Sequence, residues 1–69
     1  MKVNLELLEM KISDRGMTIE KFSEKIGINP STYYRKKERG GLTFSVGQMH
    51  DIVNVLNFSM KDAKIIFLD

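Results

Sequence analysis

The chain has 69 residues, no cysteine and one histidine, and its formal net charge at pH 7 is +2. These features exclude a disulfide framework and thiolate chemistry, and a single histidine without cysteine does not make a protein zinc site. A chain of this length is expected to form one domain, here residues 1–69, with a small core. No apolar run approaches the roughly 20 residues that a membrane-spanning helix needs. We therefore expect a cytoplasmic protein with no membrane partner.

The N-terminal segment has the pattern of a helix with one buried face. Asn4 can cap its start, and Leu8 and Ile12 then fall on the same face, with Met10 widening the apolar stripe. Residues 14–16 read Asp-Arg-Gly and end the helix. A core-facing first helix is predicted.

Two further helix starts follow in quick succession. Thr18 can accept a hydrogen bond from a free N–H of the first turn, and Gly27 tolerates the backbone conformation that often ends a helix. Asn29 is a good N-cap, and Pro30 sits at the first helical position, where its missing N–H costs nothing. Because so few residues separate the two helices, the sequence predicts a sharp angle between them and a helix-turn-helix over about 18–38.

The last third of the chain predicts two more helices. Ser45 and Gln48 have the spacing of a capping box, and the apolar residues up to Leu56 follow the i, i+3, i+4, i+7 pattern of a buried helical face. Ser59 can cap a final helix that carries Ile66 on its apolar side. No strand pattern of useful length is present, so the predicted fold class is all-α with five short helices.

The positive charge is concentrated in one segment. Residues 29–42 carry four cations and one anion, whereas the rest of the chain carries seven cations and eight anions. A surface that reads DNA needs its cations at and after the second helix of the pair. The alternative interpretation is a solvated basic turn that has no partner.

The segment 17–41 reads MTIEKFSEKIGINPSTYYRKKERGG, and it resembles a known family. The residues that carry the resemblance are Thr18, Glu20, Phe22, Ser23, Gly27, Ile28, Ser31, Thr32 and Tyr33. The chain is similar to the Cro and repressor-type helix-turn-helix proteins of bacteriophages, part of the wider xenobiotic-response-element family. The resemblance covers nearly the whole chain and implies a compact, lambda-repressor-like domain that serves in a small phage genetic switch.

The chain departs from the family pattern at a few positions. Ile19 stands where many relatives have a glutamine that touches a phosphate, so a contact there would come from backbone N–H groups or from Thr18. Ser23 replaces a common alanine and is small enough to keep the helices close. Lys36 and Lys37 replace a second apolar anchor, and their aliphatic stems can cover part of the core.

The charge cluster and the resemblance together predict a sequence-specific regulator of transcription that binds a double-stranded DNA operator. The recognition helix, about 30–38, would lie in the major groove, with Tyr33 in the core. The expected base-reading residues are Ser31, Thr32, Tyr34 and Arg35. The expected phosphate-binding residues are Thr18, Asn29, Lys36, Lys37, Arg39, Thr43 and Ser45.

A second hypothesis keeps the same fold and assigns a protein partner. The domain would be an antirepressor or modulator that binds a phage repressor, through a surface formed by Tyr33, Tyr34, Arg35 and the loop to Phe44. A homodimer is a further option, with contacts expected at Met60, Ile65, Phe67 and Leu68. No nucleophile, base and orienting group can be assembled from the sequence. No enzymatic activity, metal, cofactor or small-molecule substrate is therefore expected.

Overall fold

The computed structural model describes residues 3–68, which form five helices and contain no strand. The helices are α1 (Leu5–Asp14), α2 (Ile19–Lys25), α3 (Pro30–Glu38), α4 (Val46–Leu56) and α5 (Met60–Phe67). The radius of gyration of the Cα atoms is 10.7 Å, so the helices form a compact globule. The predicted all-α fold class is confirmed. Among the described helices, none is long and apolar enough to cross a membrane.

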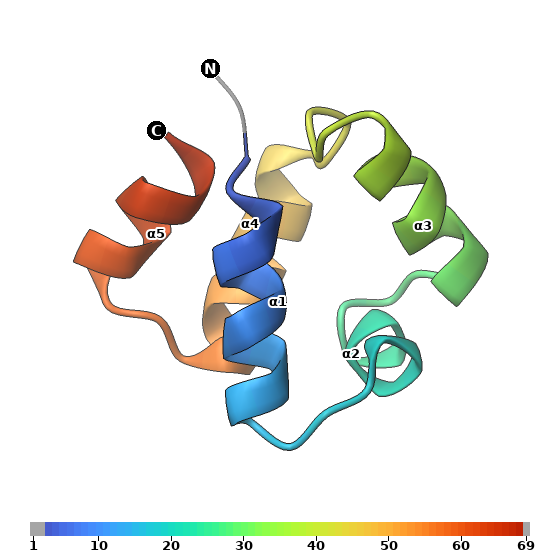
Figure 1. The fold of residues 1–69 in the computed structure, drawn as a ribbon, viewed down its shortest axis with the longest axis horizontal. Coiled ribbons are helices and arrows are strands. Elements are labelled where there is room, and N and C mark those ends of the chain that lie inside the picture. The colour runs from blue at the N-terminus through green and yellow to red at the C-terminus, as the bar shows by residue number, and fades with distance from the viewer. Residues whose placement is uncertain (1–2, 69) are drawn as a thin grey trace.

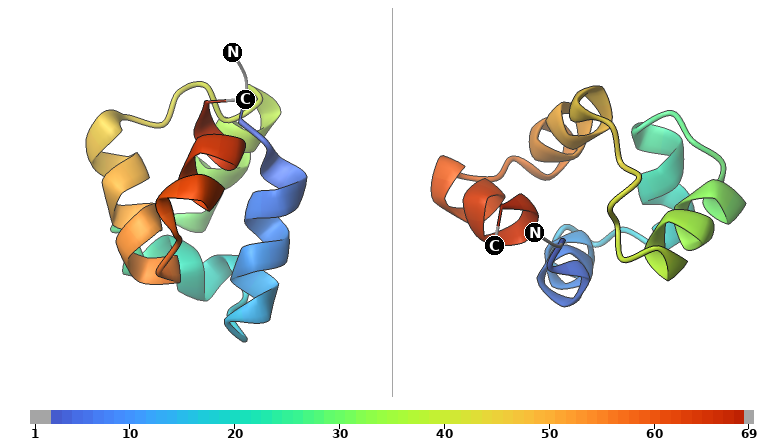
Figure 2. Two further views of the ribbon diagram at one scale, coloured as in Figure 1. Left: turned by 90° about the vertical axis from the view of Figure 1, so that its left-hand side faces the viewer. Right: turned by 90° about the horizontal axis from the view of Figure 1, so that it is seen from above.

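The helices surround a single core (Figure 1). Seen from above, α1 and α4 lie on opposite sides of the core, α5 closes one end, and α2 and α3 close the other (Figure 2). Helix α1 contacts α5, and α2 contacts α3. The backbone N–H of Asn4 donates to the carbonyl of Ile66 at 2.7 Å, which fixes the start of α1 to the last turn of α5.

Side-chain caps explain where the helices begin. The side-chain oxygens of Asn4, Thr18 and Ser59 each accept a hydrogen bond from a first-turn N–H, and Asn29 accepts one from Ser31. Ser45 forms the predicted capping box, in which its hydroxyl accepts from the Gln48 N–H at 3.0 Å and its own N–H donates to the Gln48 side chain at 2.9 Å. These contacts satisfy N–H groups that have no partner inside their helix. All five predicted helix starts are confirmed.

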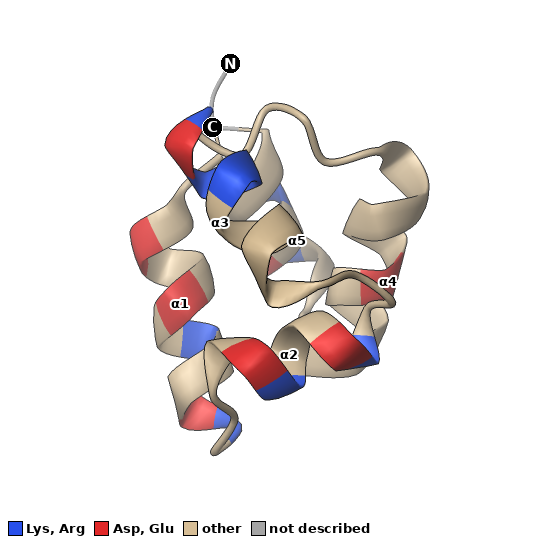
Figure 3. Ribbon diagram, turned by 90° about the vertical axis from the view of Figure 1, so that its right-hand side faces the viewer, with Lys and Arg blue, Asp and Glu red and all other residues tan. Residues whose placement is uncertain are grey.

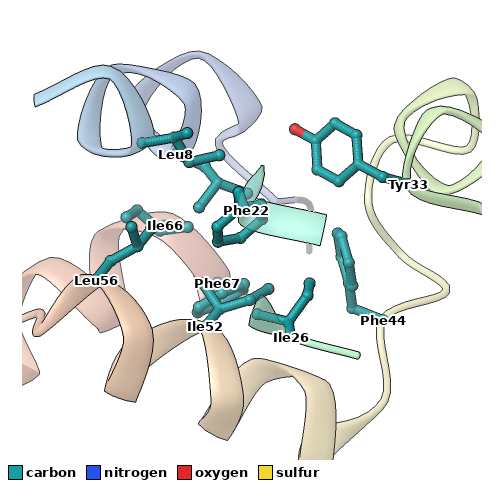
Figure 4. Close-up of a cluster of buried hydrophobic side chains, with 10 residues drawn as sticks. Leu8, Phe22, Ile26, Tyr33, Phe44, Ile52, Leu56, Ile66 and Phe67 are labelled. Atoms are coloured by element: carbon teal, nitrogen blue, oxygen red, sulfur yellow. The ribbon is translucent and has the colours of Figure 1, made fainter. Parts of the chain in front are cut away.

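The core contains side chains from every helix and from the loop before α4 (Figure 4). Its members are Leu8, Ile12, Phe22, Ile26, Tyr33, Phe44, Ile52, Leu56, Ile66 and Phe67. The predicted inward positions Leu8, Ile12, Ile52, Leu56 and Ile66 are thus buried, whereas Met49 and Val53 of α4 are half-buried against the core. The prediction for Met10 is wrong, because this side chain is 56% exposed. Met10 lies two positions after Leu8, about 200° further round the helix, and therefore points away from the core.

Helices α2 and α3 pack closely at a steep angle, and α2 is seen nearly end-on where α3 runs across the view (Figure 1). Ser23 of α2 is fully buried, and its hydroxyl donates to the Ile19 carbonyl at 2.8 Å, so its polar group is satisfied inside the helix. The rings of Phe22 and Tyr33 meet edge to face with their centroids 6.1 Å apart. The aromatic pair is therefore a direct packing contact between the two helices.

The loop from α3 to α4 contains two consecutive glycines that both have a positive φ, +70° at Gly40 and +77° at Gly41. A Cβ placed on Gly40 would meet nothing within 4 Å, whereas one placed on Gly41 would lie 2.8 Å from the Cβ of Val3. The loop can therefore pass close to the segment before α1 only if residue 41 has no side chain.

These two glycines provide a matched pair for a stability test. Gly40→Ala should cost about 1–2 kcal/mol because alanine is strained at a positive φ. Gly41→Ala should cost about 1–3 kcal/mol more, because the added methyl group also overlaps Val3. Urea denaturation of both variants measures the difference. In a double-mutant cycle, Gly41→Ala should cost less in a Val3→Gly background, because that background lacks the Cβ of Val3 that the added methyl group overlaps. Equal losses for the two single variants would contradict the close approach.

Candidate nucleic-acid interface

One face of helix α3 points to solvent and the other packs against the rest of the protein. The outward face carries residues spaced i, i+3, i+4 and i+7, namely Ser31, Tyr34, Arg35 and Glu38, all of them exposed. The inward face carries Tyr33 and the half-buried Lys36, and the exposed Lys37 lies at the edge between the two faces. Tyr33 is fully buried, as predicted. The two lysines lie one turn further along the helix and contact other parts of the protein through their ammonium groups.

Three predicted base-reading residues lie together on the outward face, and the half-buried Thr32 lies beside them. The Ser31 hydroxyl donates to the Asn29 side chain at 2.9 Å. Tyr34 is 44% exposed, and its ring packs edge to face on Tyr33 at 5.7 Å between centroids. The guanidinium of Arg35 donates to the Thr32 hydroxyl over a long 3.4 Å. Because the Arg35 contact is long and the Tyr34 ring is partly exposed, these two side chains can bind groups outside the protein, whereas the Ser31 hydroxyl would bind them as an acceptor or after leaving Asn29.

Lys36 contacts the loop that precedes α4. Its ammonium donates to the carbonyl of Thr43 at 2.9 Å and lies 5.5 Å from the centroid of the Phe44 ring. The stem of this lysine therefore lies against the edge of the core while its charge stays near the surface. The contact also ties the end of α3 to the loop that carries Thr43.

Lys37 contacts α1 through a carboxylate that the sequence analysis did not single out. Its ammonium lies 2.9 Å from Oε2 and 3.1 Å from Oε1 of Glu9, and the Tyr33 hydroxyl donates to the same Oε2 at 2.8 Å. Both oxygens of Glu9 are thus engaged by α3, and the Tyr33 hydroxyl points toward α1 (Figure 4). No local pattern signals this cluster, because Glu9 is 24 residues from Tyr33 and 28 from Lys37.

The cluster shifts the pKa values of two of its members. Partial burial of Glu9 raises the pKa of its carboxyl, but the hydrogen bonds from Lys37 and Tyr33 and the charge of Lys37 outweigh that effect, so the pKa is lowered. Burial, followed by the hydrogen bond to Glu9 and its charge, raises the pKa of Tyr33 well above its ordinary value. Glu9 is therefore ionised and Tyr33 protonated at neutral pH.

The other predicted phosphate-binding residues lie at the starts of α2, α3 and α4, in the loop before α4 and at the end of α3. Thr18, Asn29 and Ser45 use their side-chain oxygens as helix caps, and Thr43 is exposed. Arg39 is exposed at the end of α3 and, among residues 3–68, forms no salt bridge. The side-chain oxygens of Thr18, Asn29 and Ser45 already accept a hydrogen bond from a backbone N–H of their helix. A phosphate could therefore accept a hydrogen bond only from the side-chain hydroxyl or amide N–H of these residues, or from a first-turn backbone N–H that the cap leaves free. Arg39 therefore brings the charge that is least engaged elsewhere.

The distribution of charge is uneven over this side of the molecule (Figure 3). The cations of α3 lie in its C-terminal half, while acidic and basic residues alternate along α2. Acidic residues also lie on α1, which flanks α3 in this view. No group of three or more potential metal-binding side chains is found in the described part of the chain.

Two expectations about exposed contacts need correction. Tyr33 and Phe44 were expected in the surface for a repressor partner, but both are core residues. Phe67 was expected at a dimer contact, but it is only 5% exposed because it turns inward beside Ile66. Of the surface expected for a repressor partner, Tyr34 and Arg35 remain exposed, together with most of the loop before Phe44.

Helices α4 and α5 form an apolar groove of about 330 Å³ on another side of the molecule. Its lining residues are Val46, Met49, His50, Val53, Met60, Ala63, Lys64, Phe67 and Leu68. Three of these, Val46, Met60 and Leu68, are large apolar side chains that are more than 60% exposed. Ile65, the remaining residue expected at a dimer contact, is 40% exposed outside the groove.

Comparisons with the models of protein families, with curated proteins and with solved structures give no significant match to this chain.

The Glu9 cluster predicts a pH dependence of stability. Because folding lowers the pKa of Glu9, its contribution is present above the unfolded value of about 4.3 and is lost as the pH falls through the lower folded value. Urea denaturation at neutral pH and at about pH 3 should therefore give a free-energy gap between wild type and Glu9→Gln that narrows in acid. A gap that stays constant between the two conditions would contradict the assigned pKa shift.

Proposed function

We propose that this protein is a sequence-specific, double-stranded DNA-binding regulator of transcription, of the Cro/repressor type found in phage genetic switches. In this proposal α2 and α3 are the two helices of a helix-turn-helix in a lambda-repressor-like domain, and α3 enters the major groove of an operator. The observation that carries the proposal is the outward face of α3, where Ser31, Tyr34 and Arg35 project from a helix that is fixed from behind by Tyr33. Such a protein would work in the cytoplasm.

Each side chain on this face has a chemical role in base recognition. Arg35 would donate two hydrogen bonds to the O6 and N7 atoms of a guanine, since its contact with Thr32 is long and easily exchanged. Ser31 and Thr32 would donate to or accept from base edges, and the methyl group of Thr32 can also meet a thymine methyl group. Tyr34 would lie flat on a base methyl or reach a phosphate with its hydroxyl.

The phosphate contacts would follow from the residues around this face. Arg39 and Lys36 would supply positive charge, and Thr18, Asn29, Thr43 and Ser45 would supply hydroxyl or N–H donors. Such contacts fix the register of the protein on the duplex but do not read its sequence. Glu38 lies on the same face at the end of α3, and its charge would repel phosphate. This repulsion would limit how closely the end of α3 approaches the DNA backbone.

A homodimer would suit an operator of two half-sites. The exposed apolar residues Met60, Ile65 and Leu68 on and after α5 are the proposed contacts with a second copy. An interface of this kind is formed by the same patch on both subunits, so the two α3 helices would be related by a two-fold axis.

Substitutions of Arg35 and Arg39 distinguish contacts with bases from contacts with phosphates. Once a preferred operator has been selected from a randomised duplex library, Arg35→Ala should weaken its binding by about 1–3 kcal/mol and relax the preference at one base pair. Arg39→Ala should weaken all duplexes to a similar degree and reduce the slope of log K against log salt by about 0.9. Fluorescence anisotropy titrations measure both effects. An unchanged sequence preference in Arg35→Ala would remove its assigned role.

A second candidate function has its own supporting observation. The apolar groove between α4 and α5 contains Lys64 and His50 but no carboxylate, which suits an acidic amphipathic helix from a repressor protein. In this case the chain would be an antirepressor or modulator that keeps the fold and does not bind an operator.

An amide NMR titration with a generic duplex of about 20 base pairs, which is close to two turns of B-DNA, distinguishes the two functions. For a DNA-binding regulator we expect salt-sensitive shifts within residues 29–45, since nonspecific binding depends on phosphate contacts. The groove residues of α5 provide an internal control that should not shift. A complete absence of shifts at low salt would favour the modulator.

A further inference from the structure

Lys37 is held by a carboxylate before any DNA arrives. Its ammonium lies within 3.1 Å of both oxygens of Glu9, yet 44% of its side chain is exposed. A phosphate could therefore reach the same ammonium from solution. Glu9 presents two anionic oxygens to Lys37, and the two non-bridging oxygens of a DNA phosphate would do the same.

The carboxylate is itself fixed in place. Tyr33 is fully buried and donates to Oε2 of Glu9, so this oxygen cannot leave without breaking a hydrogen bond at the edge of the core. The exposed ion pair alone would be weak and easily exchanged. With Tyr33 as an anchor, Glu9 remains at the position where Lys37 can return to it.

Lys37 also lies close to the proposed DNA-reading surface. It follows Tyr34 by three residues and precedes Arg39 by two, so it lies within one helical turn of the outward face of α3. A lysine at this place that was free of Glu9 would add one phosphate contact to every duplex, whatever its sequence.

We propose that Glu9 sets the strength of DNA binding, because its carboxylate competes with DNA phosphate for the ammonium of Lys37 and so lowers the affinity for every duplex. The inference rests on the proposed DNA-binding function. Base contacts from Ser31, Thr32 and Arg35 are unaffected by the competition. The competition therefore lowers operator binding and nonspecific binding by a similar factor, and it leaves the ratio of the two nearly unchanged.

Salt-dependent binding to a generic duplex tests the competition. The slope of log K against log salt should be about 0.9 steeper in Glu9→Gln than in wild type, because Lys37 gains a phosphate contact. Glutamine keeps an oxygen acceptor for the Tyr33 hydroxyl, and circular dichroism checks that the variant is folded. Glu6→Gln is the matched control: it removes the same charge from an exposed position on α1, and it should leave the slope unchanged.

Lys37→Met gives a second, independent readout. In the wild-type background this substitution should leave the slope nearly unchanged, because Glu9 already occupies the ammonium. In the Glu9→Gln background it should abolish the gain in slope. The measurement in the wild-type background needs only that Lys37→Met folds, so it tests the inference even if Glu9→Gln does not fold.

The outcomes separate the inference from the proposed function. Binding by wild type with equal slopes in wild type and Glu9→Gln would overturn the inference and leave the proposed function standing. A gain that persists in the double variant, or that appears equally in Glu6→Gln, would also overturn it, since it would then be a general charge effect. A reduced slope for Lys37→Met in the wild-type background would show that Lys37 already contacts phosphate, and it would also overturn the inference. Absence of duplex binding by wild type would overturn both.

Discussion

The burial of Tyr33 is the constraint on which the rest of the structure depends. Its ring contacts Phe22 of α2 and Phe44 of the loop before α4, and its hydroxyl bonds to Glu9 of α1. Three separate parts of the chain are therefore positioned by one side chain of α3. Because the ring is buried and the hydroxyl is satisfied, α3 cannot rotate about its own axis without losing packing and a hydrogen bond together. That restriction turns the opposite side of α3 outward and defines the candidate site.

The helices and their starts could be predicted from the sequence because their determinants are local. Asn4, Thr18 and Ser45 lie within three residues of the N–H groups that they satisfy, and a spacing of three or four residues marks each buried face. Met10 was misassigned because a run of apolar residues does not tell which of them faces inward. Phe67 was misassigned for a related reason: four apolar residues in succession cannot share one helix face, and only packing decides which two are buried.

The candidate site could be predicted only in part. The clustering of Ser31, Tyr34 and Arg35 follows from helical spacing once α3 is recognised, and the burial of Tyr33 follows from the same spacing. The partner of Lys37 could not be predicted, since Glu9 reaches it only after α1 and α3 have packed. A count of cations in the sequence therefore overstates the charge available to a ligand. Lys37 is balanced by Glu9, and the ammonium of Lys36 is bound to a backbone carbonyl.

The hydrogen bond from Asn4 to the carbonyl of Ile66 has a consequence for how the protein forms during synthesis. It joins residues separated by nearly the whole sequence, so the chain between Asn4 and Ile66 must be closed into one long loop. The entropy cost of this closure is met in one step, after both ends have been synthesised. Helices α2 and α3, whose contacts are local, can pair while α5 is still inside the ribosome. The side of α1 that α5 covers then stays uncovered until translation has passed Ile66. A nascent chain would therefore expose that surface to chaperones and proteases at the stage when its α2–α3 pair is already assembled.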